Sequence, residues 1–180
     1  MIYLDLSNNN LNVEIPVSID QLTHLTYLGF NENNLNGEIP SSIDQLINLT
    51  QLYLKNNKLT GEIPSSICQL TNLTYLGLNK NILTGEIPSS ICQLTNLTKI
   101  YLHQNNLTGE IPSSIGQFTN LTYLDLESNS SLTGYLPVTP IGCNIDAQGT
   151  AISTVSVREK KLRKDLFFLD YWLVILYIVL

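Results

Sequence analysis

Apolar residues recur at fixed places in a unit of 24 residues that is repeated along most of the chain. In one such unit they are Leu73, Leu76, Leu78, Leu83, Ile87, Ile91 and Leu94. Six units begin at Met1, Leu25, Leu49, Leu73, Leu97 and Leu121, and the fourteen residues 59–72 return unchanged at 83–96. A single globular core gives each position a different environment, so this repetition predicts a solenoid of stacked units.

Two kinds of element are expected within each unit. The alternation of apolar and polar or small residues over 76–78 has a period of two, which is typical of a short strand. Gly85 and Pro88 then prevent one long helix. The apolar spacing over residues 89–94 favours a single helical or 3₁₀ turn, with a serine available to cap it. One unit buries too little apolar surface to offset its own ordering, so stability depends on stacking.

The pattern resembles the leucine-rich repeat family, in particular its plant-type class with the consensus LxxLxLxxNxLxGxIPxxLxxLxx. The resemblance covers roughly residues 1–140 and recurs six times in phase. It implies an α/β repeat fold, a right-handed solenoid with a concave parallel β-sheet and short 3₁₀ or helical turns on the convex side. It also implies a second short strand around each LTGEIP segment. The family serves mainly as a recognition scaffold, in extracellular receptors and enzyme inhibitors among others.

The sequence departs from this pattern at both ends of the array. Val13 stands where the later units have glycine, the last unit ends in LTGYLP, and no cysteine-bearing cap is visible. Met1 occupies the first leucine position, so we expect an open apolar end. These features favour a fragment, a decayed copy or an incomplete gene model, and the alternative is a first unit that frays and is tolerated.

Asparagine recurs at one position of every unit. In the family this column is a buried ladder, whose side-chain amides bond to main-chain groups in the bend after the strand. Burying those groups without partners would be costly, which agrees with a structural role. The predicted ladder consists of Asn9, Asn33, Asn57, Asn81, Asn105 and Asn129.

Three columns beside the strand leucines vary from unit to unit. The first is Tyr3, Tyr27, Gln51, Tyr75, Lys99, Tyr123; the second is Asp5, Gly29, Tyr53, Gly77, Tyr101, Asp125; the third is Ser7, Asn31, Lys55, Asn79, His103, Glu127. Tyrosine supplies a large, stiff contact area with a polar tip, which suits binding hot spots. We predict a concave surface that binds a protein, peptide or glycan through Tyr27, Tyr53, Lys55, Tyr75, Tyr101, His103 and Tyr123. The alternative is that aromatic residues only fit a sheet face.

Two further columns carry residues with metal-binding or redox chemistry. One consists of Glu14, Glu38, Glu62, Glu86 and Glu110, and the other of Asp20, Asp44, Cys68, Cys92 and Gly116. Solvated carboxylates on an exposed edge repel one another weakly, so we predict neither a metal site nor a cofactor. Adjacent units could bring Cys68 and Cys92 into disulfide range, but we favour unpaired thiols that act as small apolar side chains.

Charge and motifs narrow the function classes. Residues 1–144 carry four lysines against eleven acids, which argues against a nucleic-acid partner. The chain has two histidines and neither a nucleophile elbow nor a phosphate loop, so we predict that it is not an enzyme. Two alternatives to ligand recognition stay open, an array fragment without independent function and an ice-binding solenoid. The second would use the threonine column Thr26, Thr50, Thr74, Thr98 and Thr122.

The location is predicted from sequons and from the C-terminal region. Glycosylation is expected at Asn48, Asn72, Asn96 and Asn120 in a secreted protein. Asn106 and Asn129 also begin sequons, and Asn129 belongs to the ladder. An extracellular or cell-surface location follows from the resemblance. A cytoplasmic one stays open because no signal peptide opens the chain.

Three segments are expected overall: a solenoid of six repeats over 1–144, a linker with a basic cluster over 145–164, and a hydrophobic C-terminal segment over 165–180. The last segment is shorter than the ~20 residues of a spanning helix, and the basic cluster precedes it, opposite to the order in a receptor. We favour membrane association over a truncated span or a frame-shifted sequence.

Overall fold

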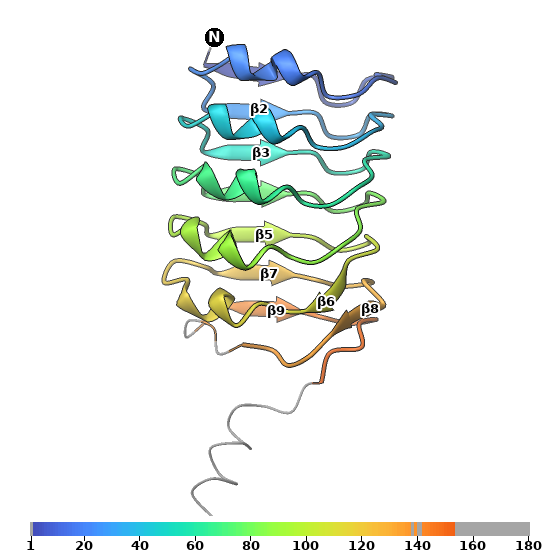
Figure 1. Cartoon of the computed structure of the whole chain (residues 1–180), viewed down its shortest axis with the longest axis vertical. Helices are drawn as coiled ribbons and strands as arrows, with labels where there is room; N and C mark the ends of the chain where they lie inside the picture. Colours follow the sequence, from blue (N-terminus) through green and yellow to red (C-terminus); the bar gives the residue numbers. More distant parts are fainter. Residues whose placement is uncertain (1, 138, 140–141, 154–180) are drawn as a thin grey trace, which may run out of the picture.

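The chain folds into a stack of similar coils, seen in the computed structural model, which describes residues 2–137, 139 and 142–153 (Figure 1). Each coil contributes one strand to a parallel sheet of seven strands. The strands are β1 (Tyr3–Asp5), β2 (Tyr27–Gly29), β3 (Gln51–Tyr53), β4 (Tyr75–Gly77), β5 (Lys99–Tyr101), β7 (Tyr123–Asp125) and β9 (Asn144–Asp146). Leu28, Leu52, Leu76 and Ile100 lie in register on successive strands. The predicted solenoid is therefore confirmed.

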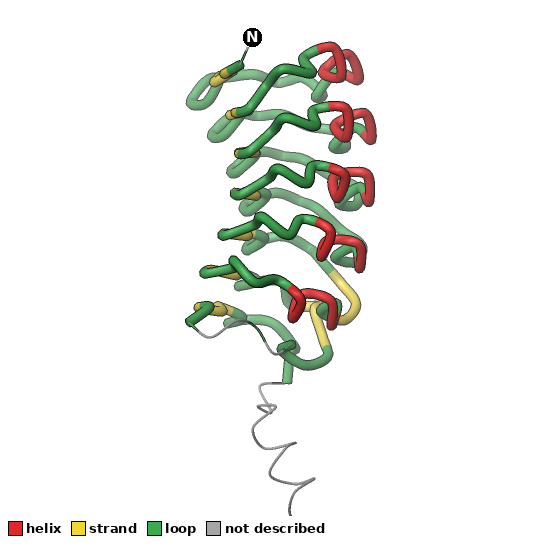
Figure 2. Tube along the Cα trace, turned by 90° about the vertical axis from the view of Figure 1, so that its left-hand side faces the viewer, coloured by secondary structure: helices red, strands yellow, loops and turns green. Residues whose placement is uncertain are grey.

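Five coils return on the side opposite to the sheet through short 3₁₀ helices (Figure 2). These are η1 (Val17–Gln21), η2 (Ser41–Gln45), η3 (Ser65–Gln69), η4 (Ser89–Gln93) and η5 (Ser113–Gln117). The predicted serine cap is wrong, because a proline holds the N-cap position and no side chain caps these helices. The turn closes instead through main-chain bonds such as Ile43 N–H to the Pro40 carbonyl at 3.0 Å, and the Ser42 hydroxyl donates to the Val17 carbonyl of the preceding coil.

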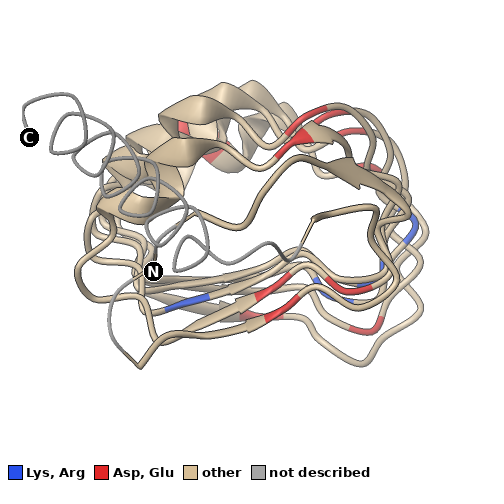
Figure 3. Cartoon of the chain, turned by 90° about the horizontal axis from the view of Figure 1, so that it is seen from below, with Lys and Arg blue, Asp and Glu red and all other residues tan. Residues whose placement is uncertain are grey.

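Along the chain, the second strand of the unit comes after the strand of the main sheet and before the 3₁₀ helix. It is developed as β6 (Thr108–Glu110) paired with β8 (Ser131–Thr133), while earlier coils have single bridges such as Glu62 with Thr84. Gly85 lies in this segment with a φ of 71°. A Cβ atom there would come within 2.7 Å of the Glu62 Cγ atom, so the backbone and the neighbouring side chain both select glycine. In the end view of Figure 3, the ribbon is coloured for acidic residues along this edge.

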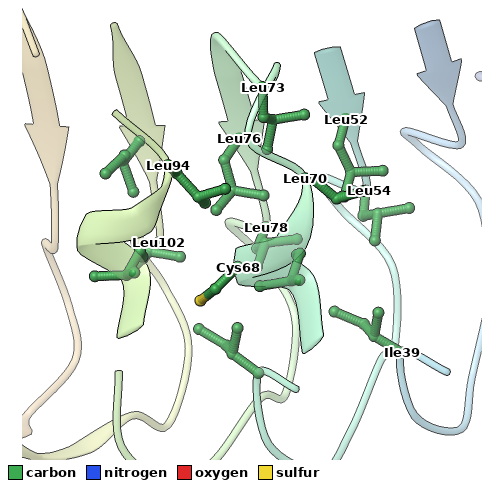
Figure 4. Packing of buried hydrophobic residues seen from close by; sticks show 14 of the residues in the cluster. Ile39, Leu52, Leu54, Cys68, Leu70, Leu73, Leu76, Leu78, Leu94 and Leu102 are labelled. Carbon is green, nitrogen blue, oxygen red and sulfur yellow. The ribbon is translucent and has the colours of Figure 1, made fainter. Parts of the chain in front are cut away.

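The core fills the space between the sheet and the 3₁₀ helices (Figure 4). Leu52, Leu76 and Leu78 are fully buried, as is Cys68. Burial raises the pKa of the Cys68 thiol, to which the Ser90 hydroxyl donates at 3.2 Å. Cys68 and Cys92 are both free thiols, so the prediction that they are unpaired is confirmed.

The array continues beyond the boundary predicted at residue 144. Strand β9 pairs in parallel with β7, and the following residues bond to the coil before them, with Ser128 N–H to the Gln148 carbonyl at 2.7 Å and Ala151 N–H to the Leu132 carbonyl at 2.9 Å. The linker prediction is therefore wrong for residues 145–153. Main-chain hydrogen bonds need no leucine pattern, so this seventh coil forms after the repeat has faded.

The rest of the predicted linker and the hydrophobic segment 165–180 lie outside the described residues. In the part of the chain that is described, no helix is long and apolar enough to cross a lipid bilayer.

Candidate binding surface on the sheet face

The asparagine ladder fixes the bend that follows each strand of the sheet. Asn81 Nδ2 donates to the carbonyls of Leu54 at 2.9 Å and Leu78 at 3.0 Å, and its Oδ1 accepts the Leu59 N–H at 3.1 Å. One amide thus joins main-chain groups of two coils. The same set of bonds is made by Asn33, Asn57, Asn105 and Asn129, all buried.

Asn9 differs from this buried set. It is exposed, and its amide donates only to Leu6 and Ser7 of its own coil. Its predicted burial is wrong, because no described coil packs against it on the N-terminal side.

The residue before each ladder asparagine has a left-handed backbone conformation. Its φ is between 53° and 58° in every coil, at Asn8, Glu32, Asn56, Lys80, Gln104 and Ser128. Glycine adopts this conformation without strain, asparagine tolerates it with little strain, and other residues are strained in it. At this bend the chain turns away from the sheet. The bend therefore marks the end of the residues in each coil that contribute to the sheet face.

Six tyrosines form one continuous row across the sheet face. Ring centroids are 4.1 Å apart for Tyr3 and Tyr27, 5.2 Å for Tyr27 and Tyr53, and 4.2 Å for Tyr53 and Tyr75. The row continues at 5.4 Å to Tyr101 and then at 5.1 Å to Tyr123. We call these residues the tyrosine row. It begins in the first column with Tyr3 and Tyr27, and from Tyr27 onward it alternates between the first and the second column, so this part crosses the sheet as a zigzag.

Four phenols of the tyrosine row have pKa values above the ordinary range. Burial raises the pKa of the phenols of Tyr27, Tyr53 and Tyr75 above their usual value. Burial also raises the pKa of Tyr123, with a further contribution from the negative charge of Asp125. Some hydroxyls are already engaged, as that of Tyr53 donates to Gln51 Oε1 at 3.0 Å. The row therefore offers ring edges and phenolic O–H groups rather than charge.

A polar cluster flanks the C-terminal half of the tyrosine row. His103 Nε2 lies 2.9 Å from Asn79 Nδ2, and His103 Nδ1 lies 2.8 Å from Asp125 Oδ2. The latter contact is out of line for a hydrogen bond, so it is an ionic contact when the imidazole is protonated. Asp125 is buried and also accepts the Glu127 N–H at 3.2 Å. The sequence singled out His103 but not its two partners, which only the parallel register brings together.

Lys55 lies in the same third column, one coil from Asn79. Its Nζ is 2.9 Å from Glu32 Oε1, and its N–H donates to Asn31 Oδ1 at 2.8 Å. Hydrogen bonds from Lys55 and then Asn56 lower the pKa of the Glu32 carboxyl. The lysine charge is therefore balanced locally, and the predicted contact residues all lie on one face.

The threonine column and the sequon asparagines have partners in the solenoid itself. The Thr74 hydroxyl donates to the Thr50 carbonyl at 2.9 Å, and Thr26, Thr50, Thr98 and Thr122 bond in the same way to the coil before. Asn72 Nδ2 donates to the Ile47 carbonyl at 2.9 Å, with equivalent bonds at Asn48, Asn96 and Asn120. These four asparagines are exposed.

A groove of about 730 Å³ lies on the glutamate side of the solenoid, lined in part by Glu62, Pro64, Glu86 and Pro88. These residue types are the same in neighbouring coils, so the groove belongs to the repeated framework. Among the described residues no three His, Cys, Asp or Glu side chains gather in a way that could hold a metal ion. The sheet face is where residues vary, and we place the candidate site there.

Several solved structures that resemble this one come from plant proteins. A plant peptide hormone receptor, RGFR1 in complex with RGF2, is 37% identical over 84% of this chain, with a TM-score of 0.78. The Arabidopsis receptor kinase HAESA in complex with the peptide hormone IDA and the co-receptor SERK1 is 33% identical over 86%, with a TM-score of 0.80. A plant ice-binding protein is 36% identical over 84%, with a TM-score of 0.70.

The matched part is 25% of the first receptor chain, 26% of the second and 49% of the ice-binding protein. A search of curated proteins gave no significant match. Sequence profiles match at nearly every coil: Leucine Rich Repeat at 1–22, 24–46, 48–70 and 72–94, and Leucine Rich repeats (2 copies) at 95–136. With the register of the strands and the asparagine ladder, these matches establish that the chain belongs to the leucine-rich repeat family.

Proposed function

We propose that this chain is a non-enzymatic recognition module that binds a peptide or a segment of another protein on its sheet face. The observation that carries the proposal is the continuous tyrosine row, flanked by the polar residues of the third column. The similar solved structures support the same class, since two of them are plant receptors in complex with a peptide.

The tyrosine row has the physical properties of a binding surface. Each ring is held by its neighbours before any ligand arrives, so little side-chain entropy is lost when a ligand binds. Phenol groups also combine apolar area with a hydrogen-bonding tip. Beside them, the partly exposed side chains of His103 and Lys55 offer polar groups that can select among ligands, while the buried Asn79 contacts His103.

The packing of the rings bears on the class of ligand. Rings between the ends of the row have a neighbouring ring on both sides, at centroid distances of 4.1 to 5.4 Å. Sugar rings are commonly bound by stacking on a free aromatic face. In this row Tyr3 is stacked on Tyr27 and Tyr53 on Tyr75, so one face of each of these four rings is already occupied. Ring edges and hydroxyls suit the carbonyl and amide groups of a polypeptide, so we favour a peptide or protein over a glycan.

An extracellular or cell-surface location fits this function and the exposed sequons at Asn48, Asn72, Asn96 and Asn120. If the chain is secreted, we expect glycans at these four positions. Enzymatic deglycosylation of protein expressed in plant cells, followed by intact-mass measurement, tests this expectation.

The binding proposal is tested by replacing Tyr53, Tyr75 and Tyr101 with alanine in one variant. Extracellular plant peptides and proteins captured by the wild-type chain provide the ligand, whose affinity is then measured by titration calorimetry. We expect the triple variant to lose affinity by at least about 100-fold, because one truncated hot-spot residue costs about 2 kcal/mol or more and the three losses do not simply add.

The matched control carries three alanines on the opposite side, at the exposed Gln45, Gln69 and Gln93. It should bind like the wild type, and circular dichroism should show that both variants are folded. Equal binding by the tyrosine variant would place the site elsewhere on the molecule. Failure of the wild type to capture any ligand would favour the alternative of an array fragment without independent function.

Similarity to a plant ice-binding protein keeps ice binding as a second candidate. The threonine column that suggested it donates its hydroxyls to main-chain carbonyls, so those O–H groups are engaged within the fold. Thermal hysteresis of the purified protein tests the idea directly, and a value at the level of a control protein removes it.

A further inference from the structure

We propose that Gly29 and Gly77 are positioning residues of the tyrosine row. Each leaves free the space that the ring of the tyrosine two residues earlier must occupy. Without them, we infer, the six rings would not form one row. This inference rests on the proposed function only for its effect on ligand binding, since the arrangement of the rings can be measured without a ligand.

The backbone does not require glycine at either position. Seven other glycines have a positive φ, but Gly29 and Gly77 do not, and both lie within strands. Glycine inside a strand is unfavourable, because it loses more conformational freedom than other residues and has no side chain to pack. Its presence on these two strands therefore needs a reason other than backbone geometry.

The reason is visible in the space above Gly77. A Cβ atom built there would lie 2.9 Å from Tyr75 Cε1, and its next nearest atoms would be Tyr75 Oη at 3.5 Å and Tyr75 Cζ at 3.6 Å. The nearest neighbours of this absent side chain thus all belong to one ring. The ring of Tyr75 lies over its own strand, in the place that a side chain at residue 77 would fill.

The parallel register explains why the ring is held there. Gly77 pairs with Tyr53 on β3 and with Tyr101 on β5, so its column would have a gap between two tyrosines. The Tyr75 ring fills that gap, stacked at 4.2 Å on Tyr53 and tilted at 5.4 Å from Tyr101. The glycine thereby links tyrosines on three successive strands.

Gly29 repeats the arrangement two coils earlier. A Cβ atom there would lie 2.9 Å from Tyr27 Cε1 and 2.7 Å from Asp5 Oδ1. Where the second column holds a tyrosine, at Tyr53 and Tyr101, the first column holds Gln51 and Lys99 instead. No described strand of the sheet carries two tyrosines, and from β2 to β7 the tyrosine alternates between the two columns.

The test is a double-mutant cycle of Gly77→Ala and Tyr75→Ala, read by urea unfolding and by near-ultraviolet circular dichroism of tyrosine. In the wild-type background we expect Gly77→Ala to reduce the tyrosine signal and lower the urea midpoint. In the Tyr75→Ala background the same change should raise the midpoint or leave it unchanged, because alanine suits a strand better than glycine once the ring is gone.

Two controls keep the result specific. In the background of Tyr75→Phe, which keeps the ring, Gly77→Ala should again lower the midpoint. Gly116→Ala, at an exposed position of η5 where other coils have aspartate or cysteine, should leave the tyrosine signal unchanged. The proposal is overturned if Gly77→Ala shifts the midpoint equally with and without the ring, or leaves the tyrosine signal intact. Loss of the signal with unchanged ligand affinity would reject the binding role of the row but not the role of the glycine.

Discussion

The asparagine ladder and the tyrosine row both run along the first six coils of the solenoid, yet their partners differ. Ladder asparagines bond to main-chain groups, as Asn81 does to Leu54, Leu78 and Leu59. Tyrosines of the row contact one another, as Tyr75 does with Tyr53. Main-chain groups are the same in every coil, so the residue that satisfies them must be the same as well. Contacts between side chains carry no such constraint, which leaves the sheet face free to vary and to recognise a ligand.

The largest change in stability is expected for Asn81→Ala, which removes one asparagine of the ladder. It leaves the buried Leu59 N–H without an acceptor, while the carbonyls of Leu54 and Leu78 lose one of two amide donors and keep those of the neighbouring ladder asparagines. We therefore expect a loss of about 2 to 3 kcal/mol in the free energy of unfolding. Asn9→Ala is the matched control. Asn9 is exposed, and the loss there should stay below about 1 kcal/mol. Urea unfolding measures both, and equal losses would contradict a special role for burial.

A smaller effect is expected from the tyrosine row at high pH. Burial raises the folded-state pKa of Tyr75 above its ordinary value of 10.0. The folded state thus keeps the phenolic proton where the unfolded state releases it. This contribution to stability is complete below pH 10 and falls as pH rises from there toward the folded-state pKa.

Tyr75→Phe removes the titrating group and keeps the ring. Its urea midpoint should therefore decline less than that of the wild type between about pH 10 and pH 11.5. Parallel declines in the two proteins would show that the Tyr75 phenol is not protected by the fold.

The smallest effect concerns the strained bend that precedes the ladder. Gln104 has a φ of 53°, and two other coils already place asparagine at this position, Asn8 and Asn56. Because asparagine tolerates the left-handed region better than glutamine, Gln104→Asn should raise the free energy of unfolding by about 0.5 kcal/mol. Asn56→Gln should lower it by a similar amount, and a change in the same direction for both would contradict the strain argument.

The repeat in the sequence determined most of this protein's architecture. A period of 24 residues, with leucine at fixed positions, specifies which residues occupy equivalent places in successive coils. The parallel register, the columns on the sheet face and the asparagine ladder follow from that, because each coil can bury its apolar side chains only against a neighbour.

Only the tertiary structure decided how side chains in neighbouring columns and coils meet. Periodicity places Tyr75 and Tyr53 in different columns, and their contact depends on the space above Gly77. It does not show that Asp125 lies beside His103, nor that residues 144–146 add a strand. Ring orientation depends on contacts across strands, and β9 is held largely by main-chain hydrogen bonds, which leave almost no signature in the order of amino acids.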